Sequence, residues 1–229
     1  MFDKRIRALT LATGLVVWSA LVAPRVPAKA LVPLHAAGSA GLVTLTNVPL
    51  GFRPPPLWRG LRLGIVAASV VSAGVIATTG LPRVRSAMAE RELPEPVTGW
   101  LLVRIPVGTV WSEEAAFRGV LGTLAEEAFG PSWGRLLQAS TFGLSHVADA
   151  RGAGEPVVGT VLVTAAAGWV FGWLHSHSGS LLAPMLVHLA SNEAGALAAL
   201  AVQRRAVRRR GRPSAAGADP CPGRRFRRR

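Results

Sequence analysis

The chain has 229 residues, of which 50% are apolar and only 17% are charged, and its mean hydropathy is +0.35. This composition is typical of a membrane protein. The single cysteine, Cys221, excludes a disulfide framework within the chain and a cluster of thiolate metal ligands.

The net charge of +14 is concentrated at the C-terminus. Residues 204–229 hold 11 Arg and one acid, Asp219, which gives +10 and leaves +4 for residues 1–203. Arginines interspersed with Pro, Gly and Ala predict a disordered cytoplasmic tail that contacts anionic lipid headgroups. A nucleic-acid-binding tail is the less favoured alternative, so no nucleic-acid partner is expected.

Apolar stretches recur along the chain. They lie at residues 8–23, 31–50, 61–81, 97–112, 131–148, 156–174 and 180–203. Several approach the ~20 residues that a helix needs to cross ~30 Å of hydrocarbon, so we predict an all-α polytopic membrane protein with about 6–8 transmembrane helices. A soluble helical core would need charged faces at helical spacing, which 61–81 and 156–174 lack. We expect a multi-pass protein of a bacterial plasma membrane.

The N-terminus imitates a secretory signal. The basic MFDKRIR precedes the apolar LTLATGLVVWSALVA, and Ala28-Lys29-Ala30 resembles a small-residue cleavage site. Because further apolar stretches follow, we favour an uncleaved first helix.

The segment GFRPPPLWRGLR, residues 51–62, breaks the apolar pattern. Its Pro triplet cannot continue a helix, and its arginines predict a cytoplasmic loop. Seven crossings would put the termini on opposite sides, although both basic ends look cytoplasmic, so we expect one stretch not to cross. The weakest is 31–50, but omitting it would place the arginines of 51–62 outside. The orientation therefore stays open.

A second break, LPRVRSAMAERELPEPV at 81–97, precedes the part of the chain that carries the polar intramembrane residues. We therefore expect three parts. They are N-terminal transmembrane helices at 1–96, a helical core at 97–203 and a basic disordered tail at 204–229. The polar residues of the core form three groups.

The first group is Glu113, Glu114 and Arg118. An acid or a base at the centre of a transmembrane helix costs roughly 2.5–3.5 kcal/mol, so such residues usually pair or line a watery cavity. Glu114 and Arg118 share a helix face, whereas Glu113 points about 100° away. Arg118 can therefore neutralise Glu114 and leave Glu113 free to act as a general base. The alternative is a surface ion pair at an interfacial helix end.

The second and third groups are Phe142 with His146, and His188 with Asn192. The four-residue spacing puts both members of each group on one helix face, so Phe142 can wall the imidazole of His146. Each group alone also fits an ordinary core or interfacial polar pair. Together with the acids they supply a base for water, imidazoles to orient or ligate it, and donors for an oxyanion. This combination predicts a hydrolytic site.

The motifs EEAAFRG, FGLSH and GSLLAPMLVHLASN resemble, in order, the three motifs of a family of intramembrane proteases. This is the CAAX protease and bacteriocin-processing family (CPBP, also called Abi), which includes the Rce1-like prenyl-protein endopeptidases. Its pattern is Glu-Glu-x-x-x-Arg, then Phe-x-x-x-His, then His-x-x-x-Asn or Asp. The resemblance covers about residues 97–200, and its motifs are specific for the family but not for the substrate.

The resemblance implies roles for the matching residues. Glu113 would be the base that, with His146, prepares water for attack on a peptide carbonyl. His188 and Asn192 would stabilise the oxyanion. We therefore expect an intramembrane endopeptidase acting near the membrane interface on a peptide or protein substrate, lipidated or not. The alternative is a non-catalytic membrane protein, or a proton-coupled transporter that uses the same Glu and His residues.

The resemblance also implies that Glu114 and Arg118 brace the site. Members of the family are described both as metalloproteases and as glutamate proteases that act without metal. Glu114, His146 and His188 would be the candidate ligands of a divalent ion such as zinc, with a fourth position left open. The sequence does not choose between the two types.

Other polar residues fit structural roles better. His175 and His177 are expected in a polar loop before GSLL, and Glu126 with Glu127 at an interfacial helix end. Two further residues are treated in the same way. Asp149 is expected in a loop from which it could orient His146. The intramembrane Arg104 would pair with an acid across the bundle.

Overall fold

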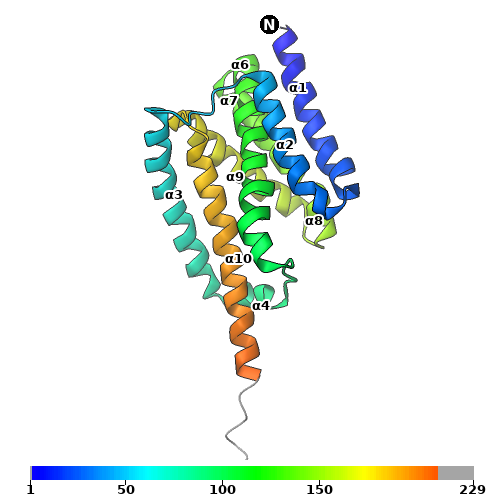
Figure 1. The fold of residues 1–229 in the computed structure, drawn as a ribbon, viewed down its shortest axis with the longest axis vertical. Helices are drawn as coiled ribbons and strands as arrows, with labels where there is room; N and C mark the ends of the chain where they lie inside the picture. The colour runs from blue at the N-terminus through cyan, green and yellow to red at the C-terminus, as the bar shows by residue number, and fades with distance from the viewer. Residues whose placement is uncertain (1, 211–229) are drawn as a thin grey trace, which may run out of the picture.

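A computed structural model of the chain describes residues 2–210, and this part folds into a helical bundle without strands (Figure 1). The expected all-α class is confirmed. In chain order the helical segments are α1 (Phe2–Val17), η1 (Trp18–Val22), η2 (Ala23–Arg25), α2 (Ala28–Thr46), α3 (Pro56–Thr79), α4 (Pro82–Glu90), α5 (Val97–Gly99), η3 (Trp100–Trp111), η4 (Glu114–Gly122), α6 (Thr123–Phe129), α7 (Pro131–Ser145), α8 (Val147–Gly152), α9 (Val157–Ser178) and α10 (Leu182–Arg210).

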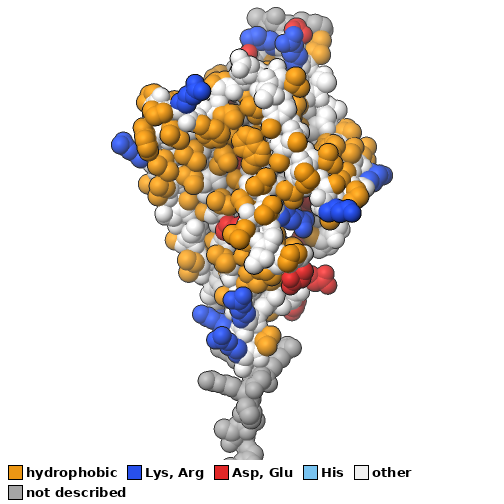
Figure 2. Space-filling view, viewed as in Figure 1, with side chains coloured by type: hydrophobic (Ala, Val, Ile, Leu, Met, Phe, Trp, Pro, Cys, Tyr) orange, Lys and Arg blue, Asp and Glu red, His pale blue; other side chains and the backbone are white. Residues whose placement is uncertain are grey.

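Five helices within residues 2–210 are long and apolar enough to cross a membrane. They cover Asp3–Arg25, Ala28–Thr46, Pro56–Thr79, Val157–Ser178 and Leu182–Arg208. Figure 2 shows hydrophobic side chains over the middle of the visible face, with Lys and Arg side chains toward its ends and margins. This distribution is typical of a bundle whose flanks contact lipid and whose ends contact headgroups.

The helices pack mainly against partners that are distant in the chain. α3 packs on α10, α7 packs on α9, and α1 packs on α6 and α7. Each predicted apolar stretch forms a helix, including the weakest, 31–50, which corresponds to α2. The start of α1 and the end of α10 lie at opposite ends of the bundle (Figure 1). Of the seven predicted stretches, 97–112 and 131–148 are not among the helices that are long and apolar enough to cross a membrane.

The helix that carries the acids is longer than the stretch predicted at 97–112. Helical structure runs without a break through residues 97–129, from α5 through η3 and η4 to α6. Both η3 and η4 are π-helical. Within this helix the hydroxyl of Ser112 donates to the carbonyl of Val107, five residues earlier, at 2.8 Å. Glu113 lies between the two π-helical runs and Glu114 begins the second one. Because both acids therefore occupy the middle of a helix, the alternative of an interfacial helix end is excluded.

Two other predicted boundaries differ from the fold. α3 begins at Pro56, so the second half of the expected loop 51–62 is helical, and a proline in the first turn forfeits no helical hydrogen bond. α10 continues to Arg210, so residues 204–210 of the expected disordered tail are helical too. The rest of that tail, residues 211–229, lies outside the described residues.

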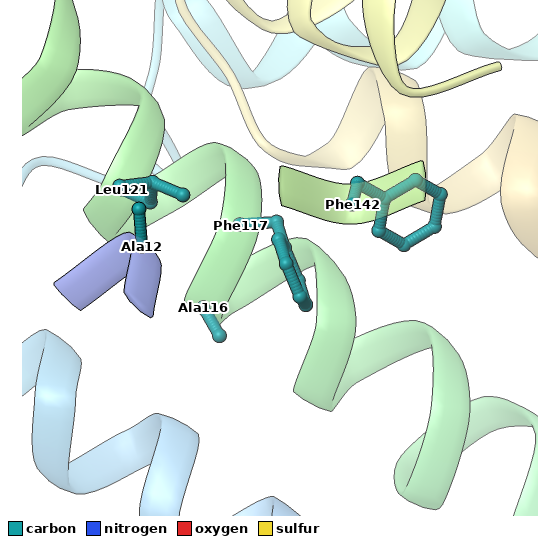
Figure 3. Packing of buried hydrophobic residues seen from close by; sticks show 5 residues of the cluster. All are labelled: Ala12, Ala116, Phe117, Leu121 and Phe142. Atoms are coloured by element: carbon teal, nitrogen blue, oxygen red, sulfur yellow. The ribbon is translucent and has the colours of Figure 1, made fainter. Parts of the chain in front are cut away.

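The first helix contributes to the core of the bundle. Ala12 of α1 belongs to a buried cluster with Ala116, Phe117 and Leu121 of η4 and Phe142 of α7 (Figure 3). Near the N-terminus of the same helix, outside that cluster, the exposed Lys4 Nζ lies 3.0 Å from Glu127 Oε2 of α6. The first helix therefore packs against the acid-bearing helix, and its retention stays a prediction.

Glycines set the spacing between α3 and α10. A Cβ atom added to Gly64 would lie 2.8 Å from Leu186 Cδ1 and 3.0 Å from Ala183 Cα. Because the backbone of α10 cannot yield, Gly64→Ala should destabilise the protein by about 1–3 kcal/mol through overpacking. Thermal unfolding in detergent measures this loss.

Gly74→Ala on the same helix is the matched control. A Cβ atom added to Gly74 meets nothing within 4 Å. Replacing this glycine should leave stability unchanged or raise it by up to about 1 kcal/mol, because alanine favours a helix. Equal unfolding temperatures for the two variants would contradict the close approach of α3 and α10.

Candidate functional site

A fully buried ion pair forms the centre of the site. The side chains of Glu114 and Arg118 are both 0% exposed, and Arg118 Nη1 lies 3.3 Å from Glu114 Oε1. The pair has the four-residue spacing that the sequence suggested, although the segment between them is π-helical. Burial removes both charges from solvent, so each depends on its immediate neighbours.

Aromatic rings cover the guanidinium of this pair. Arg118 Cζ lies 3.8 Å from the ring centroid of Phe142 and 5.0 Å from that of Phe171. Such contacts attract the cation to the negative face of the ring. Among the described residues no hydrogen-bond partner satisfies the guanidinium nitrogens of Arg118 or Glu114 Oε2. The pair is therefore held by its own attraction, by one histidine and by these rings.

That histidine is His188, in the second turn of α10. Its Nδ1 lies 2.7 Å from Glu114 Oε1. A carboxylate only accepts, so Nδ1 carries the proton and donates it to Glu114. The other ring nitrogen, Nε2, lies 3.8 Å from Glu113 Oε2. His188 thus bridges two adjacent acids, one of which is sealed while the other, Glu113, keeps 28% of its side chain exposed.

His146 caps the C-terminal end of α7, with its ring held differently. Its Nδ1 lies 2.8 Å from the carbonyl oxygen of Phe142. Because a carbonyl only accepts, Nδ1–H is again the donor, and in the neutral ring Nε2 is left with a free lone pair. The Phe142 ring lies edge-on to the imidazole at 4.7 Å between centroids, as the shared helix face predicted.

Asn192 is less free than the sequence suggested. Its Nδ2 donates to the backbone carbonyl of His188, one turn earlier in α10, at 3.1 Å. One N–H of the amide is thereby used within the helix, which leaves the second N–H for another acceptor.

Phe142 joins the three groups in space. Its ring contacts Arg118 of the first group and His146 of the second, and its centroid lies 6.4 Å from that of His188. His188 approaches both Glu113 and Glu114 directly, whereas no such contact links His146 or Asn192 to Glu113 among the residues described here. The sequence did not single out Phe171, because α9 carries none of the three motifs.

The structure does not assemble the predicted metal ligands. No three His, Cys, Asp or Glu side chains within residues 2–210 are placed to hold one ion. Of the candidates, Glu114 and His188 contact each other directly, and the Nδ1 of His146 is bound to a carbonyl. The donor set therefore does not fit a three-ligand zinc site in this arrangement.

Several residues outside the motifs lie elsewhere than expected. His175 and His177 are not in a loop but in the last turn of α9. His177 is exposed and stacks on Trp173, with centroids 5.0 Å apart. His175 lines a pocket of about 340 Å³. The other residues that line it are Pro49, Gly122, Thr123, Glu126, Glu127, Ser176 and Gly179. No residue of the three groups lines this pocket.

Two further expectations are also wrong. Asp149 lies in α8, is exposed and does not orient His146, whose Nδ1 is bound to Phe142. Arg104 is exposed on η3 and has no ion-pair partner in the described part of the chain. Glu126 and Glu127 do lie near a helix end, in α6.

Comparison with known families bears on the same segment. Residues 95–194 match the family model described as Type II CAAX prenyl endopeptidase Rce1-like. The matched segment contains all three groups of the site. No curated protein and no solved structure matches the chain. The resemblance seen in the three motifs is thus confirmed, and this segment is similar to a family of proteases.

Removing the Arg118 guanidinium from the buried ion pair with Glu114 should lower the stability of the protein strongly. Arg118→Met keeps an apolar side chain against the two rings but leaves the Glu114 carboxylate without its cation. A buried charge that loses its partner typically costs about 3–5 kcal/mol, so a comparable loss is expected. Thermal or chemical unfolding in detergent measures it.

Arg104→Met is the matched control on the same long helix. Because Arg104 is exposed and unpaired in the described part of the chain, its replacement should change stability by less than about 0.5 kcal/mol. If Arg118→Met were as stable as Arg104→Met, Glu114 would not depend on the guanidinium.

Proposed function

We propose, from the match of residues 95–194 to the Rce1-like type II CAAX prenyl endopeptidase family, that this chain is an intramembrane endopeptidase. It would hydrolyse a peptide bond near the membrane interface with activated water. The observation that carries the proposal is the bridge made by His188 between sealed Glu114 and partly open Glu113. Two chemically identical side chains are thereby given different environments, as acid–base catalysis requires.

Glu113 is the proposed general base. Its Oε2 has no hydrogen-bond partner among the described residues, and no arginine there forms an ion pair with it as Arg118 does with Glu114. A carboxylate in this state can accept a proton from water. The free Nε2 lone pair of His146 can accept a second hydrogen bond from the same water. The proton moves to Glu113 as the water oxygen bonds to the peptide carbonyl carbon.

His188 and Asn192 are the proposed donors to the oxyanion. Glu114 holds Nδ1–H of His188, which turns Nε2 toward Glu113 and the reacting carbonyl. When the ring carries a proton on both nitrogens, Nε2–H can donate to the developing negative charge. The remaining N–H of Asn192 would be the second donor. Collapse of the tetrahedral intermediate breaks the C–N bond, and Glu113 returns its proton to the leaving amine.

The substrate class follows from the family and the location of the site. A membrane-embedded endopeptidase acts on a peptide or protein that reaches the bilayer, lipidated or not. The Arg-rich C-terminal segment would contact anionic headgroups. Metal analysis of purified, active protein distinguishes the two proposed types, since stoichiometric zinc would support a metalloprotease and its absence from active protein a glutamate protease.

Loss of the proposed base should abolish cleavage. Glu113→Gln keeps the shape of the side chain but removes its basicity, so kcat should fall by at least about 100-fold with the fold intact. His188→Ala should have a similar effect because it removes the proposed oxyanion donor. The assay is cleavage of a peptide library by purified protein in detergent, with circular dichroism to verify folding.

His177→Ala is the control for an exposed histidine on the same bundle. His177 contacts Trp173 and none of the proposed catalytic groups, so this variant should keep near wild-type activity. Full activity in Glu113→Gln would remove the proposed mechanism, and loss of activity in all three variants would show that the assay reports folding instead.

A further inference from the structure

Phe171 places α9 in direct contact with the site, although α9 contributes none of the three motifs. The residue is 7% exposed. Its ring lies 5.3 Å from the imidazole of His188 at an interplanar angle of 33°, and 5.0 Å from the guanidinium carbon of Arg118. One side chain thus contacts both partners of Glu114.

Two glycines bring this ring into position. A Cβ atom added to Gly168 would lie 3.1 Å from Phe142 Cδ1, and one added to Gly172 would lie 2.8 Å from Gln138 Oε1. These glycines are four residues apart, so they form one small-residue face against α7. Helices in membranes approach closely along such faces. The close approach of α9 to α7 sets Phe171 beside the ion pair.

The ring of Phe171 adds a constraint that the other contacts do not supply. The hydrogen bond to Glu114 fixes Nδ1 of His188 but still allows the imidazole to rock about that bond. The Phe171 ring, tilted by 33° to the imidazole, packs against it and opposes this rocking, and Phe142 approaches the imidazole edge-on at 84°. The direction of Nε2 is therefore determined by three neighbours.

We propose that Phe171 is a positioning residue, which holds the His188 imidazole in the plane that aims Nε2 at the reacting carbonyl and holds Arg118 against Glu114. The proposal rests on the proposed peptidase function. Phe171 does not touch the water or the substrate and acts only through His188 and Arg118. Its loss should therefore lower the rate of the chemical step more than the affinity for substrate.

Phe117 provides a matched comparison. It is 5% exposed and belongs to the buried cluster of Figure 3. Its ring contacts that of Phe142 at 5.1 Å, but in the described part of the chain no ring contact joins it to the His188 imidazole or the Arg118 guanidinium. Replacing either phenylalanine by leucine removes one buried ring. The two variants differ in whether that ring contacted the His188 imidazole and the Arg118 guanidinium.

The test compares Phe171→Leu with Phe117→Leu, using the internally quenched peptide that wild-type protein cleaves fastest in a screen. Phe171→Leu should lower kcat by about tenfold or more with KM changed less than about twofold, since small misplacements of reacting groups have effects up to about 100-fold. Phe117→Leu should keep kcat within about threefold. Equal kcat values in the two variants would overturn the positioning role.

A second readout does not depend on cleavage. The imidazole ¹⁵N signals of His188, assigned by their disappearance in His188→Gln, should show a protonated Nδ1 in wild type and an exchange-broadened ring in Phe171→Leu. Unchanged His188 signals in that variant would overturn the proposal even if activity fell. If wild type cleaved no peptide, the peptidase function would fail while these signals still tested the position of the ring. Phe171→Met, which keeps a long apolar side chain, replaces Phe171→Leu if the latter does not fold.

Discussion

The buried pair of Glu114 and Arg118 is the constraint on which the site depends. Removing two charges from water costs several kcal/mol per ion, and their mutual attraction offsets this only with good geometry and additional partners. Here the additional partners are the rings of Phe142 and Phe171 and the Nδ1–H of His188. The two rings that offset the cost of burying this ion pair also pack against His188. The same contacts therefore stabilise the pair and align the imidazole.

Small residues allow these partners to meet. Lipid supplies little hydrophobic force between helices, so close packing has to hold them together. Gly64 permits α10 to approach α3, and Gly168 and Gly172 permit α9 to approach α7. The first contact fixes the helix that carries His188, and the second fixes the helix that carries Phe171. Alanine at these positions would move both side chains relative to Arg118, which lies on a third helix.

The sequence predicted the pairs that depend on local spacing. Glu114 with Arg118 and Phe142 with His146 follow from a four-residue separation on one helix. It could not predict the π-helical runs around the acids, because apolar periodicity in a buried segment does not distinguish them from an α-helix. The contact of Phe171 with the site could not be predicted from the sequence either, because only the packing of α9 distinguishes this residue from many other apolar residues. The polar His175 and His177 resembled a loop because the exposed last turn of a helix also tolerates polar side chains.

His146 and His188 differ in the acceptor to which Nδ1–H donates its hydrogen bond. This difference suits each of them to a different proposed role. His146 donates to a neutral backbone carbonyl, which leaves Nε2 of the neutral ring suited to receive a hydrogen bond from water. His188 donates to the buried carboxylate of Glu114, whose same oxygen also lies 3.3 Å from Arg118 Nη1. When this ring carries a proton on both nitrogens, Nε2–H can donate to an oxyanion. One imidazole can therefore act on the nucleophile and the other on the carbonyl, as hydrolysis by activated water requires.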